Sequence, residues 1–351
     1  MLLFASHRYP GGSAIGKFSF NKAVKVARLQ SSLRIAAVVP CYKSKKTVLN
    51  VICAIGQEIE TIIIVDDACP EGTGPYAKAN SLDPRLLLIE HKTNQGVGGA
   101  VISGYRAAIE RGFDIVVKID SDGQMDPALV PSLVRSIEVG IADYVKGNRF
   151  FNPEDAARMP FERLIGNLGL SFLTKLSAGY WDIFDPTNGF TAIHRSALKA
   201  LPLEKLSRRY FFETDMLFRL NIAGAVVVDM PMTALYGDEV SNLSPIRSLF
   251  SFTLKHIGVF GKRVAYRYFI RDFNLGSIDL IFACLFLLFG LTFGLHEWWQ
   301  SLATGNPATA GTVMLAALPL ILGVQFTIGF WAQDCSSVPR TPLQLRVLEK
   351  P

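Results

Sequence analysis

The sequence predicts an α/β protein in which a mixed, mostly parallel sheet is followed by amphipathic helices and a two-helix transmembrane hairpin. Three observations favour this class. From Leu33 to about Val240, short β-branched runs alternate with amphipathic segments of helix length, a pattern typical of parallel sheets covered by helices. A basic segment with apolar residues at helical spacing comes next. Two long, almost uncharged runs follow it.

Five runs of the first part are predicted strands, and three segments are predicted helices. The strands are Ile35–Val39, Thr61–Val65, Leu86–Ile89, Ile115–Ile119 and Tyr144–Val145. The helices are Lys45–Ile55, Gly98–Arg111 and Pro127–Val139. Ligands of such sheets bind beyond the carboxyl ends of the strands, so the residues that follow each strand are the first candidates for a functional site.

Composition excludes several classes of protein. Half of the 351 residues are hydrophobic and 19% are charged, so the chain is not a disordered one. Its five cysteines are scattered and form no C-x-x-C pair, which argues against a disulfide framework or a zinc cage. The net charge of +6 could attract nucleic acid or an anionic membrane. Because the basic residues lie beside the apolar runs, we predict a membrane partner and no nucleic acid.

A transmembrane hairpin is predicted over residues 276–333, with helices at 276–297 and 312–333. The first helix holds a run of 16 residues in which only Thr292 is polar, and Val313–Trp331 carries no charge. Starting the first run at Gly276 takes in Asp279 near its edge and gives 20 residues, about the length that crosses about 30 Å of hydrocarbon, and the second run has 19 residues. Lys and Arg flank both ends of the pair, and the loop between the runs has neither. The positive-inside rule therefore predicts a two-span protein with the α/β domain and both termini in the cytoplasm.

The remaining segments complete the expected domain order. Residues 1–33 form a basic tail, residues 34–244 the α/β domain, and residues 334–351 a cytoplasmic tail. Residues 245–272 are predicted to form amphipathic helices on an anionic membrane surface, divided at Gly258 and Gly261. A core helix with a solvated basic face is the alternative. On this division, a chain cut before Gly276 should leave a domain that still binds anionic vesicles.

Two strand ends of the α/β domain carry residues suited to a nucleoside. Pro40 stops the first strand, and Tyr42 beyond it could stack on a base. Asp66 and Asp67 are adjacent carboxylates that close the second strand. The glycine-rich segment at 94–100 fails the strict G-x-G-x-x-G spacing, so we interpret it as a tight turn into a closely packed helix.

A third strand end offers ligands for a metal ion. Asp120 and Asp122 stand at i and i+2 after an apolar strand, and Gln124 adds an amide oxygen at i+4. Mg²⁺ and Mn²⁺ accept such hard oxygen ligands. The set is too small for a dedicated cage, so substrate phosphates should complete the coordination. The sequence thus predicts Mg²⁺ or Mn²⁺ as the cofactor.

Seven segments together resemble a known family. They are VVPCY (38–42), IIVDDACPEGT (63–73), NQGVGGAV (94–101), DSDGQ (120–124), GNRF (147–150), DPTNGF (185–190) and FFETDM (211–216). Their order and spacing, over roughly Ile35 to Ser244, resemble family 2 glycosyltransferases with the GT-A fold, and in particular polyprenyl- and dolichol-phosphate sugar synthases. The hairpin behind a basic amphipathic helix is similar to the membrane-anchored members.

The resemblance implies residue roles on the donor side and on the acceptor side. Donor roles fall on Pro40, Tyr42, Asp66 and Asp67 for the nucleoside, and on Asp120, Asp122 and Gln124 for the metal and diphosphate. Acceptor roles fall on Arg149 and Arg163, which match two phosphate-binding arginines, with Asn167 assisting. Asp185 matches a carboxylate proposed to face the reacting centre, although a structural role at a turn is the alternative. Glu213 and Asp215 match the acidic position that serves as base in relatives with hydroxyl acceptors.

The function implied is the inverting transfer of a hexose from a nucleotide sugar, of the UDP-glucose or GDP-mannose type, to a polyprenyl phosphate at the cytoplasmic membrane face. Transfer to a hydroxyl of a glycolipid or polysaccharide precursor is the main alternative. A nucleotidyltransferase and a non-enzymatic membrane scaffold are weaker ones. Lys43-Ser44 replaces the Asn-Glu of many members, which weakens the nucleotide contacts expected there. Gly123 stands where a Leu is frequent and Met125-Asp126 replaces a His-Pro pair, so the sugar stays open. A homo-oligomer is also left open.

Overall fold

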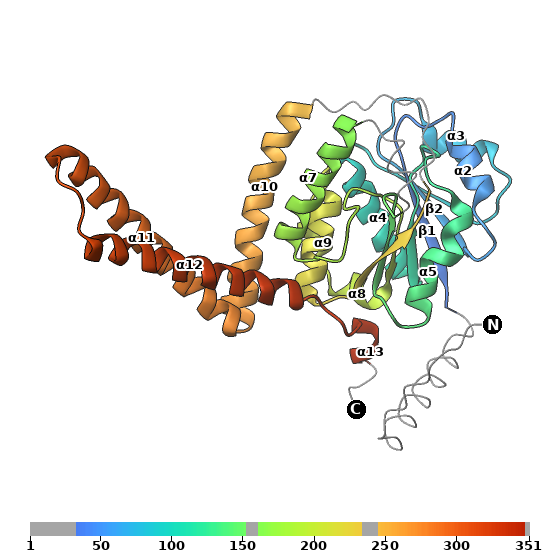
Figure 1. Ribbon diagram of the computed structural model, residues 1–351. Coiled ribbons are helices and arrows are strands. Elements are labelled where there is room, and N and C mark those ends of the chain that lie inside the picture. Colours follow the sequence, from blue (N-terminus) through green and yellow to red (C-terminus); the bar gives the residue numbers. More distant parts are fainter. Residues whose placement is uncertain (1–32, 152–160, 234–244, 348–351) are drawn as a thin grey trace, which may run out of the picture.

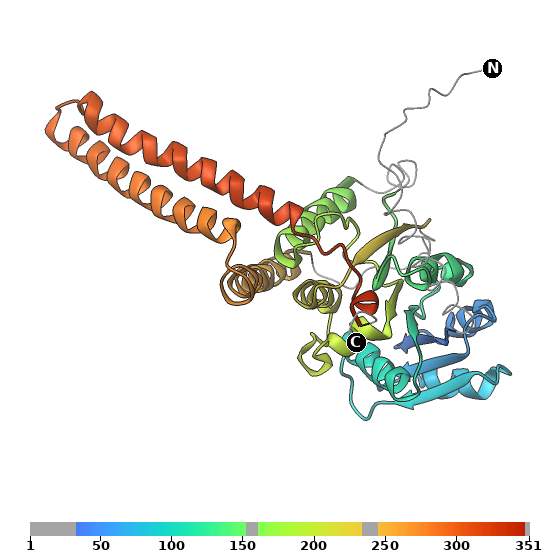
Figure 2. The same ribbon diagram turned by 90° about the horizontal axis from the view of Figure 1, so that it is seen from below.

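The computed structural model describes residues 33–151, 161–233 and 245–347 (Figure 1). An α/β domain, one long helix beside it and a protruding helical hairpin follow one another along the chain (Figures 1 and 2). This order agrees with the predicted fold class. The expected tail over residues 1–33 lies, except for Leu33, outside the described residues.

A seven-stranded sheet forms the centre of the domain, in the order β3-β2-β1-β4-β6-β5-β7. The strands are β1 (Ile35–Cys41), β2 (Thr61–Asp66), β3 (Leu86–Glu90), β4 (Ile115–Lys118), β5 (Tyr144–Asn148), β6 (Thr191–His194) and β7 (Val227–Pro231). Neighbouring strands are parallel except β6, which runs antiparallel to β4 and β5. The five predicted strands are confirmed, and β6 and β7 are additional.

Helices cover both faces of the sheet because its strands are apolar on both sides. In β2, Ile62 and Ile64 point to one core cluster and Ile63 and Val65 to the other, and all four are fully buried. The helices of the domain are α2 (Val48–Ala54), α3 (Thr73–Asn80), α4 (Val97–Glu110), α5 (Val130–Glu138), α7 (Phe161–Ala178), α8 (Arg195–Ala200) and α9 (Phe212–Ala223), with 3-10 turns η2 (Pro127–Leu129) and η3 (Leu203–Lys205). Helices α2, α3 and α5 pack on one face, and α4, α8 and α9 on the other.

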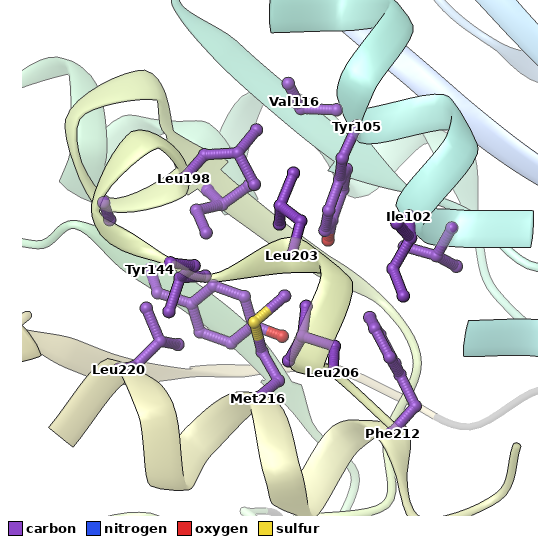
Figure 3. Packing of buried hydrophobic residues seen from close by; sticks show 14 of the residues in the cluster. Ile102, Tyr105, Val116, Tyr144, Leu198, Leu203, Leu206, Phe212, Met216 and Leu220 are labelled. Atoms are coloured by element: carbon purple, nitrogen blue, oxygen red, sulfur yellow. The ribbon is translucent and has the colours of Figure 1, made fainter. Parts of the chain in front are cut away.

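The core cluster that contains Ile63 and Val65 lies between the sheet and helices α4 and α9. Tyr105 of α4, Tyr144 of β5 and Met216 of α9 meet there, with leucines from the segment between α8 and α9 filling the space (Figure 3). Burying such side chains contributes roughly 1.5–3 kcal/mol each. The core therefore fixes the strand ends, and with them the residues that follow.

The basic segment after the domain forms one continuous helix. Helix α10 (Pro245–Ala265) continues into the π-helical turn η4 (Tyr266–Arg271). The predicted division at Gly258 and Gly261 is wrong. A glycine costs a helix about 1 kcal/mol relative to alanine, and the packing of the opposite face, which includes the buried Val259, offsets that cost.

The predicted hairpin consists of two long apolar helices. The most apolar 18-residue stretches of helix α11 (Leu275–Thr304) and helix α12 (Ala310–Ser336) have mean hydropathies of 2.3 and 2.1. Only 11% and 17% of these stretches is buried inside the protein. By length and composition both are candidate membrane spans. Gly290 packs on Leu320 and Gly323 on Leu287, so the absence of side chains lets the two helices approach closely.

The segment after α12 returns to the α/β domain. It ends in the short helix α13 (Leu343–Val347), whose first backbone N–H groups, at Leu343 and Gln344, donate to the buried Asp143 carboxylate at 2.8 and 3.2 Å. The Gln344 side chain donates to two carbonyls of the same corner of the domain. Residues 334–347, expected as a tail, are therefore packed on the domain.

Candidate active site

The carboxyl end of β1 is joined to the acidic turn that follows β4. Ser121 Oγ donates to the Pro40 carbonyl at 2.8 Å and contacts Ser44 Oγ at 2.7 Å, and Thr47 Oγ1 donates to the Ser121 carbonyl at 2.6 Å. Tyr42, just beyond β1, leaves 47% of its surface exposed. The structure thus brings two predicted nucleoside residues to the same edge of the sheet as the predicted metal ligands.

Asp66 and Asp67 are buried and bonded to the chain itself. Asp66 accepts from the backbone N–H of Cys69 at 2.7 Å and of Gly74 at 2.6 Å. Asp67 accepts from the N–H groups of Gln95 and Gly96 at 2.8 and 2.7 Å, and its Oδ1 lies 2.7 Å from His91 Nδ1. Both carboxylates thus hold the backbone of the neighbouring loops at the carboxyl end of β2. Direct contact of either carboxylate with a nucleoside stays a prediction.

The glycine-rich segment at 94–100 starts α4, as the turn interpretation predicts. Gly96 has φ +86°, a conformation that favours glycine, and it precedes the first residue of the helix. A side chain at Gly98 would collide with the Ser207 carbonyl, so close packing requires glycine there.

The acidic turn 120–124 is partly open to solvent. The Asp120 side chain is one-quarter exposed, and Asp122 and Gln124 are half-buried. Asp122 Oδ1 accepts from the Gln124 N–H at 3.0 Å, across Gly123 at φ +79°. Within the described part of the chain, His, Cys, Asp and Glu side chains form no group of three that could hold a metal. The donors that are present are hard oxygens, so they fit a divalent cation whose other ligands come from substrate phosphates.

A buried lysine that we did not predict joins this turn to α9. Lys118, the last residue of β4, is 1% exposed and lies 2.7 Å from Asp120 Oδ1 and 3.7 Å from Glu213 Oε1. Burial alone lowers the pKa of the Lys118 ammonium, but the carboxylates of Asp120 and Glu213 outweigh it, and the pKa is raised. The lysine therefore stays charged and links the two acids.

The two acids of FFETDM point to different surroundings. Glu213, in the first turn of α9, faces Lys118 and the acidic turn. Asp215 is buried, accepts from the Ser207 N–H at 2.8 Å and pairs with Arg219 at 3.2 Å. Of the two predicted alternative bases, only Glu213 is thus brought near the predicted metal ligands.

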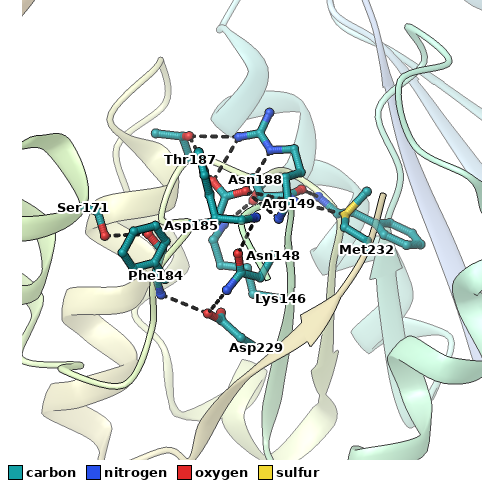
Figure 4. A network of polar contacts seen from close by, with 12 residues as sticks. Lys146, Asn148, Arg149, Ser171, Phe184, Asp185, Thr187, Asn188, Asp229 and Met232 are labelled. Atoms are coloured by element: carbon teal, nitrogen blue, oxygen red, sulfur yellow. Dashed lines mark hydrogen bonds and ion pairs between the residues drawn. The ribbon is translucent and has the colours of Figure 1, made fainter. Parts of the chain in front are cut away.

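Arg149 and Asp185 form a bidentate ion pair. Arg149, which follows β5, donates from Nε to Asp185 Oδ2 at 2.7 Å and from Nη2 to Oδ1 at 2.9 Å (Figure 4). Asp185 is fully buried. Burial raises the pKa of its carboxyl group, but the Arg149 guanidinium outweighs this effect, and the pKa is lowered. The carboxylate therefore fixes the direction of the guanidinium, and its predicted place at the reacting centre stays a prediction.

The loop 185–190 connects the Arg149 pair to the acidic turn. Lys146 of β5 donates to the carbonyl of Asn188, and Lys118 of β4 donates to the carbonyl of Gly189 at 3.2 Å. A side chain at Gly189 would collide with Asp120 Oδ2 and with Lys118 Nζ. One loop therefore contacts the predicted metal ligands at one end and the predicted phosphate-binding arginine at the other.

Two further titratable groups lie beneath this loop. Burial lowers the pKa of Lys146 to about 8, because nearby carboxylates such as Asp185 only partly compensate. Burial also raises the pKa of Asp229 in β7 to about 6, although its carboxylate accepts from the Phe184 N–H at 2.9 Å and from Asn148 Nδ2 at 2.8 Å (Figure 4). Sequence reasoning missed both groups. Their signal was a charged residue directly after two apolar residues, Tyr144-Val145 in β5 and Val227-Val228 in β7.

The remaining predicted acceptor residues belong to α7. Asn167 is half-buried on this helix. Arg163 lies in its first turn, but its side chain is outside the part of the chain that the structure describes.

The strand order, the acidic turn after β4 and the acidic helix α9 define a glycosyltransferase with the GT-A fold. Residues 36–201 match the family described as Glycosyl transferase family 2. A UDP-N-acetylglucosamine–dolichyl-phosphate N-acetylglucosaminyltransferase of Methanococcus voltae is 32% identical, over 58% of this chain and 86% of that protein. The chain belongs to glycosyltransferase family 2.

Other relatives have similar names. An undecaprenyl-phosphate mannosyltransferase of Micrococcus luteus is 29% identical, over 57% of this chain and 83% of that protein. A solved structure of glucosyl-3-phosphoglycerate synthase from Mycobacterium tuberculosis, in complex with uridine diphosphate, has a TM-score of 0.49 and 19% identity. That match covers 74% of this chain and 86% of the other.

Proposed function

We propose that the protein transfers a hexose, with inversion at the anomeric carbon, from a UDP-glucose- or GDP-mannose-type donor to a polyprenyl phosphate at the cytoplasmic face of a membrane. The observation that carries the proposal is the loop 185–190. It holds the Lys118–Asp120 pair at one end and the Arg149–Asp185 pair at the other. The loop therefore joins two proposed sites. The Lys118–Asp120 end would bind the donor diphosphate, and Arg149 at the other end would bind the acceptor phosphate. The names of the relatives from Methanococcus voltae and Micrococcus luteus support the same acceptor class.

On the donor side, the chain binds and orients the nucleotide sugar. Asp120, Asp122 and Gln124 would hold Mg²⁺ or Mn²⁺, which when bound neutralises charge on the leaving diphosphate. The exposed ring of Tyr42, two residues after Pro40, offers a face on which the base stacks. Asp66 pairs with Cys41 in the sheet, so the Asp66 and Asp67 loops begin next to Tyr42 and are assigned to the nucleoside.

On the acceptor side, the phosphate itself is the nucleophile. A phosphate monoester has a second pKa near 6, so at pH 7 it is mostly a dianion and requires no strong base. One of its oxygens bonds to the anomeric carbon while the bond from that carbon to the diphosphate breaks, and the nucleoside diphosphate leaves. Arg149, Arg163 and Asn167 hold the acceptor phosphate in line. Asp185 acts through Arg149, because its two oxygens are bonded to that guanidinium.

The membrane arrangement follows from the hairpin. Helix α11 starts beside η4, and Asp334 in the last turn of α12 is buried against the catalytic domain. Both ends of the hairpin are therefore on the same side as that domain. Together with the basic flanks this supports two spans, within 276–297 and 312–333, and cytoplasmic termini.

Transfer to a hydroxyl is the second candidate, and Glu213 favours it. A hydroxyl must lose its proton as it attacks, and Glu213 is the acid that the fold brings to the Lys118–Asp120 pair. The two candidates differ in which side chains they require.

The test uses purified protein in nanodiscs with Mn²⁺, labelled UDP-glucose or GDP-mannose, and either polyprenyl phosphate or the matching polyprenol. We expect product with the phosphate only. Arg163→Ala removes a bidentate phosphate contact, which is worth about 2–4 kcal/mol, or roughly 30- to 1000-fold in kcat/KM. Glu213→Gln should lose much less.

Arg149 needs a gentler substitution. Arg149→Ala would leave Asp185 buried without its counter-charge, so Arg149→Lys is the better variant. Lysine keeps the positive charge but lacks the planar guanidinium that binds phosphate with two parallel hydrogen bonds, so we expect partial activity. Thermal unfolding verifies that each variant is folded. If Glu213→Gln is inactive while Arg163→Ala and Arg149→Lys keep full activity, the hydroxyl acceptor replaces the phosphate.

A further inference from the structure

An acid of β7 is bonded to the residues that precede both members of the Arg149–Asp185 pair. Asp229 Oδ2 accepts from Asn148 Nδ2 at 2.8 Å and from the Phe184 backbone N–H at 2.9 Å (Figure 4). Asn148 is the residue before Arg149, and Phe184 is the residue before Asp185. One oxygen of Asp229 therefore joins the two chain segments whose next residues form the ion pair.

The two partners of Asp229 extend this connection to α7. Asn148 Oδ1 accepts from the Phe150 N–H at 2.8 Å, and the rings of Phe150 and Phe184 pack edge to face with their centroids 5.4 Å apart. The Phe184 carbonyl accepts from Ser171 Oγ of α7 at 2.5 Å. Asp229 thus connects β5 to α7, which carries the other two predicted acceptor residues.

The carboxyl group of Asp229 is costly to the fold. Its Oδ1 is buried and has no hydrogen-bond partner among the described residues. An unpaired buried acceptor costs free energy that an apolar side chain in its place would avoid. Burial raises the pKa of this carboxyl group to about 6; the Phe184 N–H and Lys146 act against burial, and Asp185 adds to it. An acid in this setting is better placed to orient its two donors than to stabilise the protein.

We propose that Asp229 is a positioning residue for transfer to phosphate: it holds the residue before each member of the Arg149–Asp185 pair, so that the guanidinium keeps the direction in which it binds the acceptor phosphate. The inference rests on the proposed function and deepens it. Asp229 acts through Asn148 and Phe184. At neutral pH its carboxyl group is mostly ionised, and an ionised acceptor forms stronger hydrogen bonds than a neutral one.

The first test separates binding of the acceptor from binding of the donor. The KM values for polyprenyl phosphate and for the nucleotide sugar are measured for the wild type, Asp229→Ala and Asp229→Asn in nanodiscs. Asp229→Ala should raise the acceptor KM at least about tenfold and the donor KM less than about twofold. Asparagine keeps an oxygen that can accept both hydrogen bonds, so Asp229→Asn should raise the acceptor KM only about threefold. Equal changes in both KM values, or an asparagine variant as impaired as the alanine variant, would overturn the proposal.

Two further variants control for a general loosening of the sheet. Asp143 is a buried acid at the amino end of β5, where it accepts from the Val226 N–H before β7 at 2.9 Å. Asp143→Asn should leave both KM values unchanged even where it lowers Tm as much as Asp229→Asn, and an acceptor-specific loss in it would contradict the proposal. Asn148→Ala removes the Asp229 bridge from its other side. It should also raise the acceptor KM, and its combination with Asp229→Ala should cost little more than the larger single change, whereas additive losses would argue against a shared bridge.

The pH profile gives a readout that a purely structural residue would not move. The quantity compared is kcat/KM of the wild type for polyprenyl phosphate, divided by that of Asp229→Asn at the same pH. Ionisation of the acceptor phosphate, and of the neighbouring Lys146 and Asp185, occurs in both enzymes and cancels in this ratio. Because asparagine does not titrate, the ratio should be about 3 at about pH 7.5 and approach 1 near pH 5, where Asp229 is protonated. A ratio that does not change with pH would refute the role of the ionised carboxylate.

Chemical modification of Arg149 separates this proposal from the one on which it rests. Phenylglyoxal, which modifies arginine, is added to the wild type and to both Asp229 variants without substrate, and the modified peptides are quantified by mass spectrometry. Arg34, which pairs with Glu60 at the surface, is the internal reference. Modification of Arg149 should be several times faster in Asp229→Ala and unchanged in Asp229→Asn, and equal rates in all three proteins would overturn the proposal. A wild-type enzyme that does not glycosylate polyprenyl phosphate refutes the proposed function, and the modification rates still decide whether Asp229 positions the guanidinium.

Discussion

Replacing Asp334 with alanine should loosen the attachment of the hairpin to the catalytic domain. Asp334, near the end of α12, accepts from Arg263 Nη1 and Nη2 at 2.6 and 3.0 Å, from the Tyr268 hydroxyl at 2.7 Å and from Trp181 Nε1 at 2.9 Å. Asp334 and Arg263 are both fully buried. One carboxylate thus ties α12 to α10, to η4 and to the segment after α7.

The magnitude follows from what the substitution leaves behind. Asp334→Ala leaves the Arg263 guanidinium buried without a counter-charge, which costs about 3–5 kcal/mol. For a domain of about 200 residues this lowers Tm by roughly 6–20 °C. The double variant Arg263→Met with Asp334→Leu leaves no buried charge. Although the Tyr268 and Trp181 donors still lose their acceptor, the double variant should be more stable than Asp334→Ala alone.

The assay is thermal unfolding of the purified protein in nanodiscs, followed by circular dichroism. Asp182→Ala removes an exposed acid close to Trp181 and serves as the control, with an expected change within about 2 °C. A Tm for Asp334→Ala equal to that of the control would refute the reasoning, and so would a double variant less stable than the single one. By the same argument, a chain cut before Gly276 loses Asp334 and α13 together, so the structure predicts a destabilised domain in place of the independent one expected from the sequence.

Three further predictions concern the site. Lys146 has a pKa of about 8 in the folded protein and 10.5 when unfolded, so the stability that depends on its neutral form is present above pH 10.5 and lost as the pH falls through 8. The free energy of unfolding of the wild type, relative to that of Lys146→Met, should therefore rise by up to about 3 kcal/mol between pH 8 and 10.5. The measurement is thermal unfolding of both proteins across this range, and a difference that does not change with pH would contradict the lowered pKa of the buried Lys146. Gly189→Ala should displace Asp120 and Lys118 and reduce transfer at least about tenfold with a small change in Tm; unchanged kinetics would show that the loop tolerates a side chain. Asp122→Asn, or EDTA added to the wild type, should abolish transfer without unfolding the protein, and full activity in EDTA would remove the metal from the proposal.

Local pattern was sufficient for most of the sheet and for the hairpin. A β-branched run such as Thr61–Val65 forms a buried strand in almost any sequence context. An uncharged run of 19 residues is typical of a membrane-spanning helix. Strand β6 was missed because its four residues form a strand only where β4 and β5 supply partners on both sides. The continuity of α10 was missed because the packing of its opposite face outweighs two exposed glycines.

The candidate site divides in the same way. Acids at the ends of β2 and β4 could be predicted to converge, since the carboxyl ends of parallel strands share one edge of a sheet. The divergence of Glu213 and Asp215 was not foreseen, although residues two apart on a helix point to different sides. Lys118 was also missed, because its role depends on the approach of α9 and of the loop 185–190.

Sequence pattern alone therefore established which segments are buried, which strand ends carry acids and which helices are apolar enough to enter a membrane. Tertiary packing decided which charges meet. Arg149 pairs with Asp185 across 36 positions of the chain, and Arg263 with Asp334 across 71. Periodicity constrains the face on which a residue lies, whereas the partner of a buried charge depends on long-range geometry that no local pattern encodes.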